Sequence, residues 1–383
     1  MKIGIFGGSF DPVHIEHTRL ARTAIDSLGL DKLFIMPAHT PPHKPWKTLA
    51  PDEIRIEACR LAFADMPKAE ISDYEILQGG TSYTYLTCRH FRELYPCAEI
   101  FWLVGTDMLR DFPTWKNTAE ILQTATLAVC ARNERTAWLE TERTAFFEKF
   151  GKEFVVLPYN GRDVASTKIR VLAGAGMDLS EFIPKKAAEY IQKSGWYEIS
   201  NAKAALALET PRRIAHSIRV AQLAAARAPS LGIPEKQAIT AALFHDCAKN
   251  LSEDSPCLDG FCLPTEWGEV PKEVAHQFAG AFVAEHIFGV KDAEVLTAIA
   301  YHTSARPNMS ALEELTFLAD MLEEERSYEG VERLRKLFWQ GDSLHECMQV
   351  ALYETLKFLE KKGGEIYPLT KAAYEFYAEK NKR

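Results

Sequence analysis

Six His and Asp residues in the second half of the chain have the types and spacing of a metal site. Apart from one adjacent pair, each follows the previous one after 18 to 31 residues, which is about the length of chain that one helical hairpin consumes. Four imidazoles and two carboxylates are enough for two metal ions, and paired metal ions act most often on phosphate esters. The residues are His216, His245, Asp246, His276, His302 and Asp320.

The His245-Asp246 dipeptide alone is weak evidence, because such a pair often arises by chance. Its surroundings are stronger evidence: it lies in the apolar segment AALFHDCAKNL, predicted to be helical, with Lys249 one turn further on. Burying these polar groups is costly unless they pair or bind a ligand, and Lys249 could neutralise a metal site or hold a phosphate. Taken singly, the other four positions could be surface or loop residues, and we interpret His286 and His345 in that way.

A second candidate site lies at residues 3–17, which read IGIFGGSFDPVHIEH. An apolar strand runs into Gly7-Gly8-Ser9-Phe10, where glycine allows close approach to a ligand. The helix predicted to begin near His14 offers a positive N-terminus that suits phosphate. His14 and His17 share one face of it, so their imidazoles could stabilise charge on a reacting triphosphate. A Gly-Gly turn after a strand is also a common structural feature.

The two candidate sites lie in parts of the chain with different patterns of predicted secondary structure. Up to about residue 175, short apolar runs alternate with helical patterns, which predicts an α/β, Rossmann-like, doubly wound parallel sheet. The strands are expected at 2–6, 33–37, 99–105, 126–132 and 153–158, and the helices at 15–29, 51–65 and 141–152.

From about residue 200 the strand signal disappears and apolar residues recur at helical spacing. We predict an all-α bundle, with a boundary near residue 198 after a closing helix over 181–197. The expected domains are residues 1–198 and 199–383, and the bundle helices are expected at 201–228, 236–251, 273–288, 292–303, 311–326 and 344–363.

Composition supports two soluble domains. The chain has 383 residues, 47% hydrophobic and 26% charged, with a net charge of −8, which argues against a nucleic-acid-coating protein. We expect a cytoplasmic protein without membrane contact, because the N-terminus lacks a signal-peptide pattern and no apolar run reaches the ~18 residues of a membrane span. The eight cysteines form no CxxC pair and are predicted to be reduced, with Cys257 and Cys262 the one pair that suggests a disulfide.

The first half resembles the HxGH nucleotidylyltransferases, on the string GGSFDPVHxxH. It is similar to nicotinate-nucleotide adenylyltransferase over about 190 residues, through a PPHK loop, GGTSYTYL, a GTD segment, TWKN and STKIR in the family's order. The resemblance implies Mg²⁺ and catalytic roles for His14 and His17. The residues it implies for ATP are Gly7, Gly8, Ser9, Phe10, His14, His17, Lys44, Gly105, Asp107, Ser166, Thr167 and Arg170. Those it implies for the mononucleotide are Ser82, Tyr83, Thr84, Trp115 and Arg132.

One position departs from the family's pattern. Glu16 stands where HxGH has glycine, and a carboxylate there would repel a triphosphate unless it points away or binds the metal. Because consecutive side chains of a helix point in different directions, Glu16 could face solvent. His39, His90 and Cys59 are interpreted as structural.

The second half resembles the HD-domain phosphohydrolases, and more narrowly the symmetrical bis(5′-nucleosyl)-tetraphosphatases, on RRIAHSIRVA, LFHDCAKNL, VAHQFAGA, AIAYHTSARPNMS and LTFLADMLEEER. The resemblance implies one metal on His216, His245, Asp246 and Asp320. A second metal would lie on His276 and His302, with Asp246 bridging. It implies iron, with manganese or zinc as alternatives, and Lys249 and Arg306 as polyphosphate contacts.

The resemblances together predict a bifunctional enzyme. The first domain would transfer AMP from ATP to nicotinate mononucleotide, and the second would hydrolyse diadenosine tetraphosphate to two ADP. Open alternatives for the second domain are a nucleotidase, a cyclic-dinucleotide phosphodiesterase or a metal-stabilised scaffold for a partner. For the first they are a nucleotide-binding regulatory module and nicotinamide mononucleotide as substrate. The oligomeric state, with a homodimer among the options, is also open.

Overall fold

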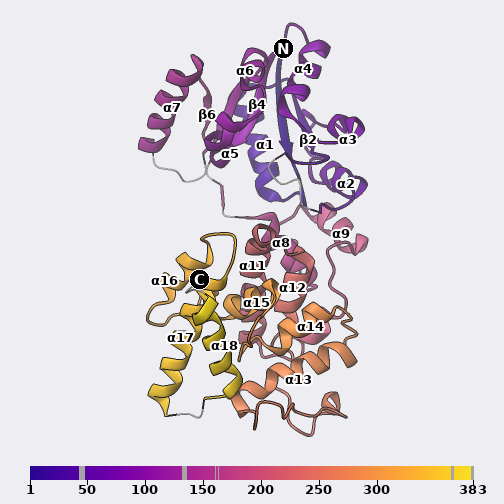
Figure 1. Ribbon diagram of the computed structural model, residues 1–383. Helices are drawn as coiled ribbons and strands as arrows, with labels where there is room; N and C mark the ends of the chain where they lie inside the picture. The colour runs from indigo at the N-terminus through magenta and orange to yellow at the C-terminus, as the bar shows by residue number, and fades with distance from the viewer. Residues whose placement is uncertain (43–47, 132–135, 160, 163, 364–365, 381–383) are drawn as a thin grey trace. The chain divides into compact units, whose positions relative to one another are not determined.

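The computed structural model describes residues 1–42, 48–131, 136–159, 161–162, 164–363 and 366–380. It divides into two compact units (Figure 1). The N-terminal unit comprises Met1–Ile169 and Leu179–Trp196, and the C-terminal unit comprises Arg170–Asp178 and Tyr197–Arg383. The chain therefore enters the C-terminal unit twice.

The N-terminal unit is built on a six-stranded parallel sheet, which confirms the predicted fold class. The strand order is β3-β2-β1-β4-β5-β6, so the direction of winding reverses between β1 and β4, where sheets of this type bind their ligands. The strands are β1 (Lys2–Gly8), β2 (Lys32–Pro37), β3 (Ala69–Ile71), β4 (Glu99–Gly105), β5 (Thr126–Cys130) and β6 (Val155–Leu157). The sequence analysis predicted five of these and missed β3.

Helices cover both faces of this sheet, because right-handed crossovers that run in opposite directions lie on opposite faces. Alternate strand residues such as Ile3, Ile5 and Trp102 form one buried cluster with side chains of α4, α5, α6 and α7, whereas α1 contacts β1, β2 and β6. The helices of this unit are α1 (Ile15–Leu28), α2 (Asp52–Ala62), α3 (Tyr74–Gln78), α4 (Thr84–Leu94), α5 (Thr106–Asp111), the 3-10 helix η1 (Phe112–Thr114), α6 (Thr118–Thr124), α7 (Thr136–Phe150) and α9 (Lys185–Ser194).

Helix α8 (Ser166–Gly174) begins in the N-terminal unit and ends in the C-terminal unit, which is otherwise helical as predicted. The helix predicted over 201–228 is two helices, because Pro211 starts a new one after the turn at Glu209 and Thr210. The further helices are α10 (Ala202–Leu206), α11 (Pro211–Arg227), η2 (Ala228–Leu231), α12 (Glu235–Phe244), η3 (Pro256–Leu258), α13 (Lys272–His286), α14 (Ala293–Ala300), α15 (Ala311–Leu322), α16 (Val331–Phe338), α17 (His345–Lys362) and α18 (Pro368–Lys380).

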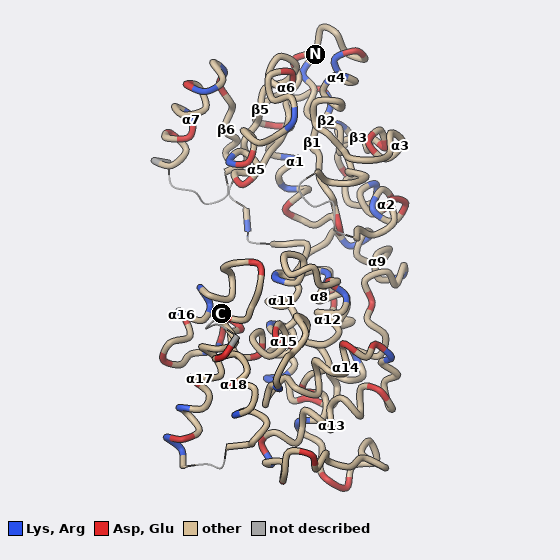
Figure 2. Tube along the Cα trace, in the orientation of Figure 1, with Lys and Arg blue, Asp and Glu red and all other residues tan. Residues whose placement is uncertain are grey.

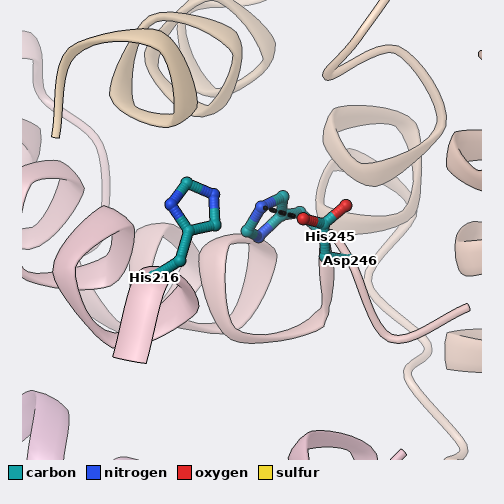
Figure 3. A group of neighbouring side chains, drawn as sticks. All are labelled: His216, His245 and Asp246. Carbon is teal, nitrogen blue, oxygen red and sulfur yellow. Dashed lines mark ion pairs between the residues drawn. The ribbon is translucent and has the colours of Figure 1, made fainter. Parts of the chain in front are cut away.

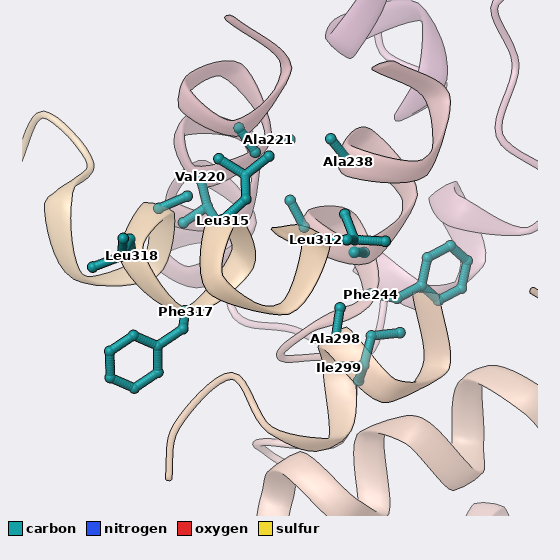
Figure 4. Packing of buried hydrophobic residues seen from close by; sticks show 14 of the residues in the cluster. Val220, Ala221, Ala238, Phe244, Ala298, Ile299, Leu312, Leu315, Phe317 and Leu318 are labelled. Atoms are coloured by element: carbon teal, nitrogen blue, oxygen red, sulfur yellow. The ribbon is translucent and has the colours of Figure 1, made fainter. Parts of the chain in front are cut away.

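The core of the C-terminal unit forms around α15, whose side chains pack against α11, α12 and α14 (Figure 4). Leu315 of α15 lies near Val220 and Ala221 of α11, and small alanines on α11 and α12 allow the helices to approach closely. This core fixes the helix ends and turns that carry the six His and Asp residues of interest.

Charges of both signs are interspersed along the two units (Figure 2). Within the part of the chain that the structure describes, no helix is long and apolar enough to cross a membrane. All eight cysteines are free thiols, and five of them are buried. The disulfide suggested for Cys257 and Cys262 is therefore not formed.

Candidate metal centre and nucleotide site

The six His and Asp residues converge inside the C-terminal unit. His216 lies on α11, His276 on α13 and Asp320 on α15, whereas His302 lies in the turn after α14. The His245-Asp246 pair also follows a helix end, because α12 ends at Phe244. The prediction that this pair lies on a helix was wrong. A turn begins at His245, and it allows the neighbouring side chains of His245 and Asp246 both to reach the cluster. The six residues are His216, His245, Asp246, His276, His302 and Asp320.

Asp246 lies close to three imidazoles of the cluster, one of which is that of His245 (Figure 3). Its Oδ1 atom lies 3.3 Å from Nε2 of His276 and 3.6 Å from Nε2 of His302, and these two nitrogens are 3.1 Å apart. Its Oδ2 atom lies 3.2 Å from Nε2 of His245. On the other side, Nε2 of His216 lies 2.8 Å from Oδ1 of Asp320.

Three of the imidazoles are oriented through their Nδ1 atoms. Nδ1 of His245 lies 2.6 Å from the carbonyl oxygen of Ala242, and Nδ1 of His302 lies 2.7 Å from that of Ile299. A carbonyl only accepts, so each Nδ1 donates its proton, and the neutral form of each ring then has its lone pair on Nε2. Nδ1 of His216 lies 3.2 Å from a carboxylate oxygen of Glu323. This arrangement, with Nε2 turned inward and Nδ1 held from behind, is typical of metal-binding histidines.

The protonation states also suit a cation. His245 and the other imidazoles hold the pKa of Asp246 well below its usual range despite burial. Burial lowers the pKa of His276 to about 4 and lowers that of His302. Burial also lowers the pKa of His245, but Asp246 and Asp320 outweigh that effect and raise it to about 9. Ionised carboxylates beside the neutral imidazoles of His276 and His302 offer oxygen and nitrogen donors, whereas His245 must release a proton when it binds a metal ion.

This donor set fits divalent metal ions. The ligand atoms form three groups, each within 4.8 Å, and Asp246 belongs to two of them. Nε2 of His245 and Oδ1 of Asp246 are buried without a well-formed hydrogen bond, which is costly unless a ligand occupies the space between such groups. The residues are His216, His245 and Asp246; His245, His302 and Asp320; and Asp246, His276 and His302.

Cationic side chains border the cluster. Lys249 was expected to be buried but is partly exposed, and its Nζ lies 2.8 Å from Nε2 of His276 and 3.5 Å from Oδ1 of Asp246. Arg213 pairs with Asp246, and Arg326 pairs with Asp320 at 2.5 Å. The sequence analysis did not single out these two arginines, although both lie within the quoted HD-type strings. Arg306 instead forms a two-pronged pair with Glu313 at 2.6 and 3.0 Å.

The second candidate site lies where β1 ends, at the switch point of the sheet. A Cβ atom on Gly7 would lie 3.0 Å from the Trp102 ring, so this strand end has no room for a side chain. Phe10 has a φ of 45° and begins a sharp turn. Buried Arg55, which the sequence analysis missed, donates to the Ser9 and Ala50 carbonyl oxygens at 2.8 and 3.0 Å and so holds this turn.

His14 and His17 stack at the start of α1, with ring centroids 3.6 Å apart. The backbone N–H of His14 donates to Nδ1 of His17 at 3.1 Å. A neutral His17 ring therefore carries its proton on Nε2, where it can donate to an anion. Ser166, at the start of α8, donates its hydroxyl to the Pro12 carbonyl oxygen at 3.2 Å. The predicted ATP residues from the two ends of this domain therefore meet around one turn.

Glu16 does not face solvent, which was one of the possible placements of its side chain. Its side chain is buried, and its carboxylate accepts from the Tyr159 hydroxyl at 2.5 Å, the Arg162 backbone N–H at 2.9 Å and Arg19 at 2.8 Å. Burial raises the pKa of Glu16, but these donors outweigh it and leave the pKa below the usual value. Tyr159 and Arg162 are more than 140 residues away, so no local sequence pattern indicates these two contacts.

The remaining predicted ATP residues take different positions. Asp107 folds back on Gly105 at the end of β4, where a Cβ atom on Gly105 would lie 2.5 Å from its Oδ1. Thr167 lies beside Ser166 in the first turn of α8. Arg170 forms a buried two-pronged pair with Glu235 within the C-terminal unit, at 2.5 and 2.8 Å. Lys44 lies outside the described residues.

The predicted mononucleotide residues around Tyr83 and Trp115 lie in two segments that contact each other. Ser82 accepts from the backbone N–H of His39 at 2.9 Å, which ties the start of α4 to the loop after β2. Lys116, next to half-buried Trp115, lies over the Tyr83 ring at 4.5 Å. This contact brings together the Ser82-Tyr83-Thr84 segment and the Trp115 segment. Arg132 lies outside the described residues.

Several residues interpreted as ordinary have structural contacts. His39 pairs with Asp52 at 3.1 Å, and His90 stacks on Tyr74. Cys59 is fully buried. His286 stacks on Phe282, and His345 lies 3.3 Å from Glu314.

Comparisons with known proteins match both halves of the chain. The cytidylyltransferase-like family model matches residues 5–172, and the HD domain model matches residues 213–325. A probable nicotinate-nucleotide adenylyltransferase of Clostridium tetani is 37% identical over 199 residues, which cover 51% of this chain and 98% of that protein. A probable nicotinate-nucleotide adenylyltransferase/Ap4A hydrolase of Mycoplasma genitalium is 30% identical over 331 residues, covering 86% of this chain and 89% of that protein.

Among solved structures, a predicted HD superfamily hydrolase involved in NAD metabolism from Clostridium acetobutylicum is 29% identical. The match covers 47% of this chain and 95% of the chain in that structure, with a TM-score of 0.44. Fold, sites and family models define a nucleotidylyltransferase-type α/β domain followed by a helical HD domain. The chain belongs to the two-domain nicotinate-nucleotide adenylyltransferase/Ap4A hydrolase family.

Proposed function

We propose that the N-terminal domain transfers AMP from ATP to nicotinate mononucleotide. A phosphate oxygen of the mononucleotide attacks the α-phosphorus of ATP. The bond from that phosphorus to the bridging oxygen breaks, and pyrophosphate leaves with deamido-NAD as the other product. Mg²⁺ bound with the ATP would offset phosphate charge.

The observation that carries this proposal is the stacked His14 and His17 pair at the start of α1. Nε2 of His17 can donate to phosphate oxygens while the helix N-terminus favours their negative charge. Ser166 brings a second helix N-terminus to the same turn. The segment around Tyr83 and Trp115 would hold the mononucleotide, since its aromatic faces suit a pyridine ring.

The test is pyrophosphate release from ATP with nicotinate mononucleotide, and in parallel with nicotinamide mononucleotide. We expect the full chain to prefer the nicotinate substrate and His17→Ala to lose at least 100-fold in kcat, because general acid and electrostatic groups contribute about that much. An unchanged rate in His17→Ala would overturn the proposed role. ATP binding without turnover in the wild type would instead favour a regulatory module.

We propose that the C-terminal domain hydrolyses diadenosine tetraphosphate to two ADP at the Asp246-centred cluster. Water attacks an inner phosphorus, the central P–O–P bridge breaks, and each half leaves as ADP. When bound there, two divalent metal ions would supply an activated water and offset phosphate charge. His216, His245 and Asp320 would hold one ion, His276 and His302 the other, and Asp246 both.

The convergence of four inward-facing imidazoles on two ionised carboxylates carries this half of the proposal. Lys249, Arg213 and Arg326 lie at the border of the cluster and are partly exposed. They would bind the phosphates that flank the attacked one, because a chain of four phosphates carries charge well beyond the metal ions. Arg306 already holds Glu313.

Product identity distinguishes the possible reactions. Anaerobically purified protein, analysed for iron, manganese and zinc, should release two ADP for each diadenosine tetraphosphate consumed. Equal release of ATP and AMP would overturn symmetrical cleavage. Turnover of nucleoside monophosphates or cyclic dinucleotides, with no ADP released from the tetraphosphate, would replace the proposed substrate. Bound metal with no turnover of any nucleotide would favour a scaffold.

A further inference from the structure

Glu16 lies between His14 and His17 in sequence, and its carboxylate binds residues of the segment after β6. Its side chain is fully buried, and three donors surround its carboxylate: the Tyr159 hydroxyl, the Arg162 backbone N–H and the Arg19 guanidinium. A buried carboxylate is costly unless its oxygens are paired. Two of these partners come from the segment after β6, more than 140 residues further along the chain.

The segment after β6 is shaped to receive this carboxylate. A Cβ atom on Gly161 would lie 2.8 Å from Oε2 of Glu16 and 2.5 Å from the Tyr159 ring. Residue 161 must therefore be glycine if Glu16 and Tyr159 are to meet. The Tyr159 hydroxyl also donates to the Glu16 carbonyl oxygen at 3.1 Å.

The same segment leads directly into α8. Ser166 begins this helix and donates to the Pro12 carbonyl oxygen at 3.2 Å. Two contacts therefore hold the start of α8 against the start of α1: the Glu16 carboxylate on the preceding segment, and the Ser166 hydroxyl on the Pro12 turn. The start of each helix favours a bound anion through its dipole.

We propose that Glu16 is a positioning residue for ATP. It fixes Tyr159 and Arg162 to α1 and thereby helps to place Ser166 and Thr167, at the start of α8, to receive ATP phosphates. The inference rests on the proposed adenylyl transfer. It accounts for a carboxylate beside a triphosphate site, because the charge is turned away and neutralised within the domain.

The test compares Glu16→Gln and Tyr159→Phe with the wild-type full chain. Glutamine keeps the shape of the side chain, but its amide nitrogen faces donors where an oxygen accepted. We expect each variant to raise both the equilibrium Kd for ATP and the KM for ATP about tenfold, a typical coupling for one lost buried hydrogen bond. The KM for nicotinate mononucleotide should not change. The double variant should be little worse than either single one, because both remove the same contact.

Glu57→Gln is the matched control, since Glu57 is exposed on α2 and pairs with Arg60. It should leave ATP affinity unchanged. Unaltered ATP affinity in folded Glu16→Gln, or an equal loss for both substrates, would overturn the proposal. If Glu16→Gln does not fold, Tyr159→Phe decides the question, because it removes a single hydroxyl. Wild-type protein that binds ATP but releases no pyrophosphate would overturn the proposed function alone, since ATP affinity still tests Glu16.

Discussion

At the scale of single residues, Glu209 shows how burial can shift a protonation state. Its carboxyl oxygens lie 2.9 and 3.2 Å from the Ser217 hydroxyl, and burial raises its pKa to about 7. The ordinary glutamate value is 4.5, so between these values the unfolded chain releases a proton that the folded protein keeps. Stability therefore falls as the pH rises through this window and then levels off above about pH 7.

Glu209→Gln should remove this dependence, because glutamine is neutral in both states. We expect the variant to gain stability relative to the wild type as the pH rises from 5 to 8, by up to about 3 kcal/mol for a shift of this size. Urea unfolding of both proteins at the two pH values measures the difference. A stability difference that is the same at both pH values would show that the folded Glu209 is ionised throughout.

Glu323 is predicted to strengthen metal binding through its contact with His216, without binding a metal ion itself. It holds Nδ1 of His216 at 3.2 Å and pairs with Arg219 at 2.6 Å. Glu323→Gln should weaken metal binding about tenfold or more, because carboxylates behind a metal-binding histidine contribute that much. Calorimetric titration with Mn²⁺ measures it. Glu325→Gln is the control, since Glu325 pairs with the same Arg219 from an exposed position, and an equal loss there would contradict the prediction.

The sequence predicted which single residues meet at the metal cluster better than it predicted their surroundings. Spacing and residue type brought His216, His276 and Asp320 to one bundle, because helical periodicity is a local signal. The burial of Glu16 and the pairing of Arg170 with Glu235 could not be predicted, because both depend on partners far along the chain.

At the scale of elements, regular patterns were predicted well and short or irregular pieces were not. The apolar strands β1, β2 and β4 stand out in the sequence, whereas β3 has three residues, AEI, and is completed only by pairing with β2. The His245-Asp246 turn follows α12 without any glycine or proline signal. Such an end is set by the packing of the bundle rather than by local propensity.

Helix α15 is predicted to carry much of the stability of the C-terminal unit. Leu315→Ala should lower the free energy of unfolding by about 2–5 kcal/mol, because Leu315 is fully buried among the bundle helices and its loss leaves a cavity. The same change at Leu263, which is exposed, should cost far less. Thermal and urea unfolding of the two variants measure both effects. Equal losses would show that α15 is not central to the core.

At the scale of the whole molecule, the residues that carry each proposed reaction lie within one unit. His14, His17 and Ser166 belong to the N-terminal unit, and Asp246 and its neighbours belong to the C-terminal unit. We therefore expect Asp246→Asn to abolish ADP release and metal binding while pyrophosphate release continues. His17→Ala should do the reverse. Assays of both reactions on both full-length variants measure this, and loss of both activities in one folded variant would contradict it.

The placement of Arg170–Asp178 in the C-terminal unit means that no single cut of the chain yields two complete domains. Val171 and Ala175 are fully buried in the helical core, yet they precede α9 of the N-terminal unit. Proteolysis or truncation near residue 198 would carry both side chains away with the wrong fragment and leave apolar surface on each piece. Recombination at that point would meet the same obstacle.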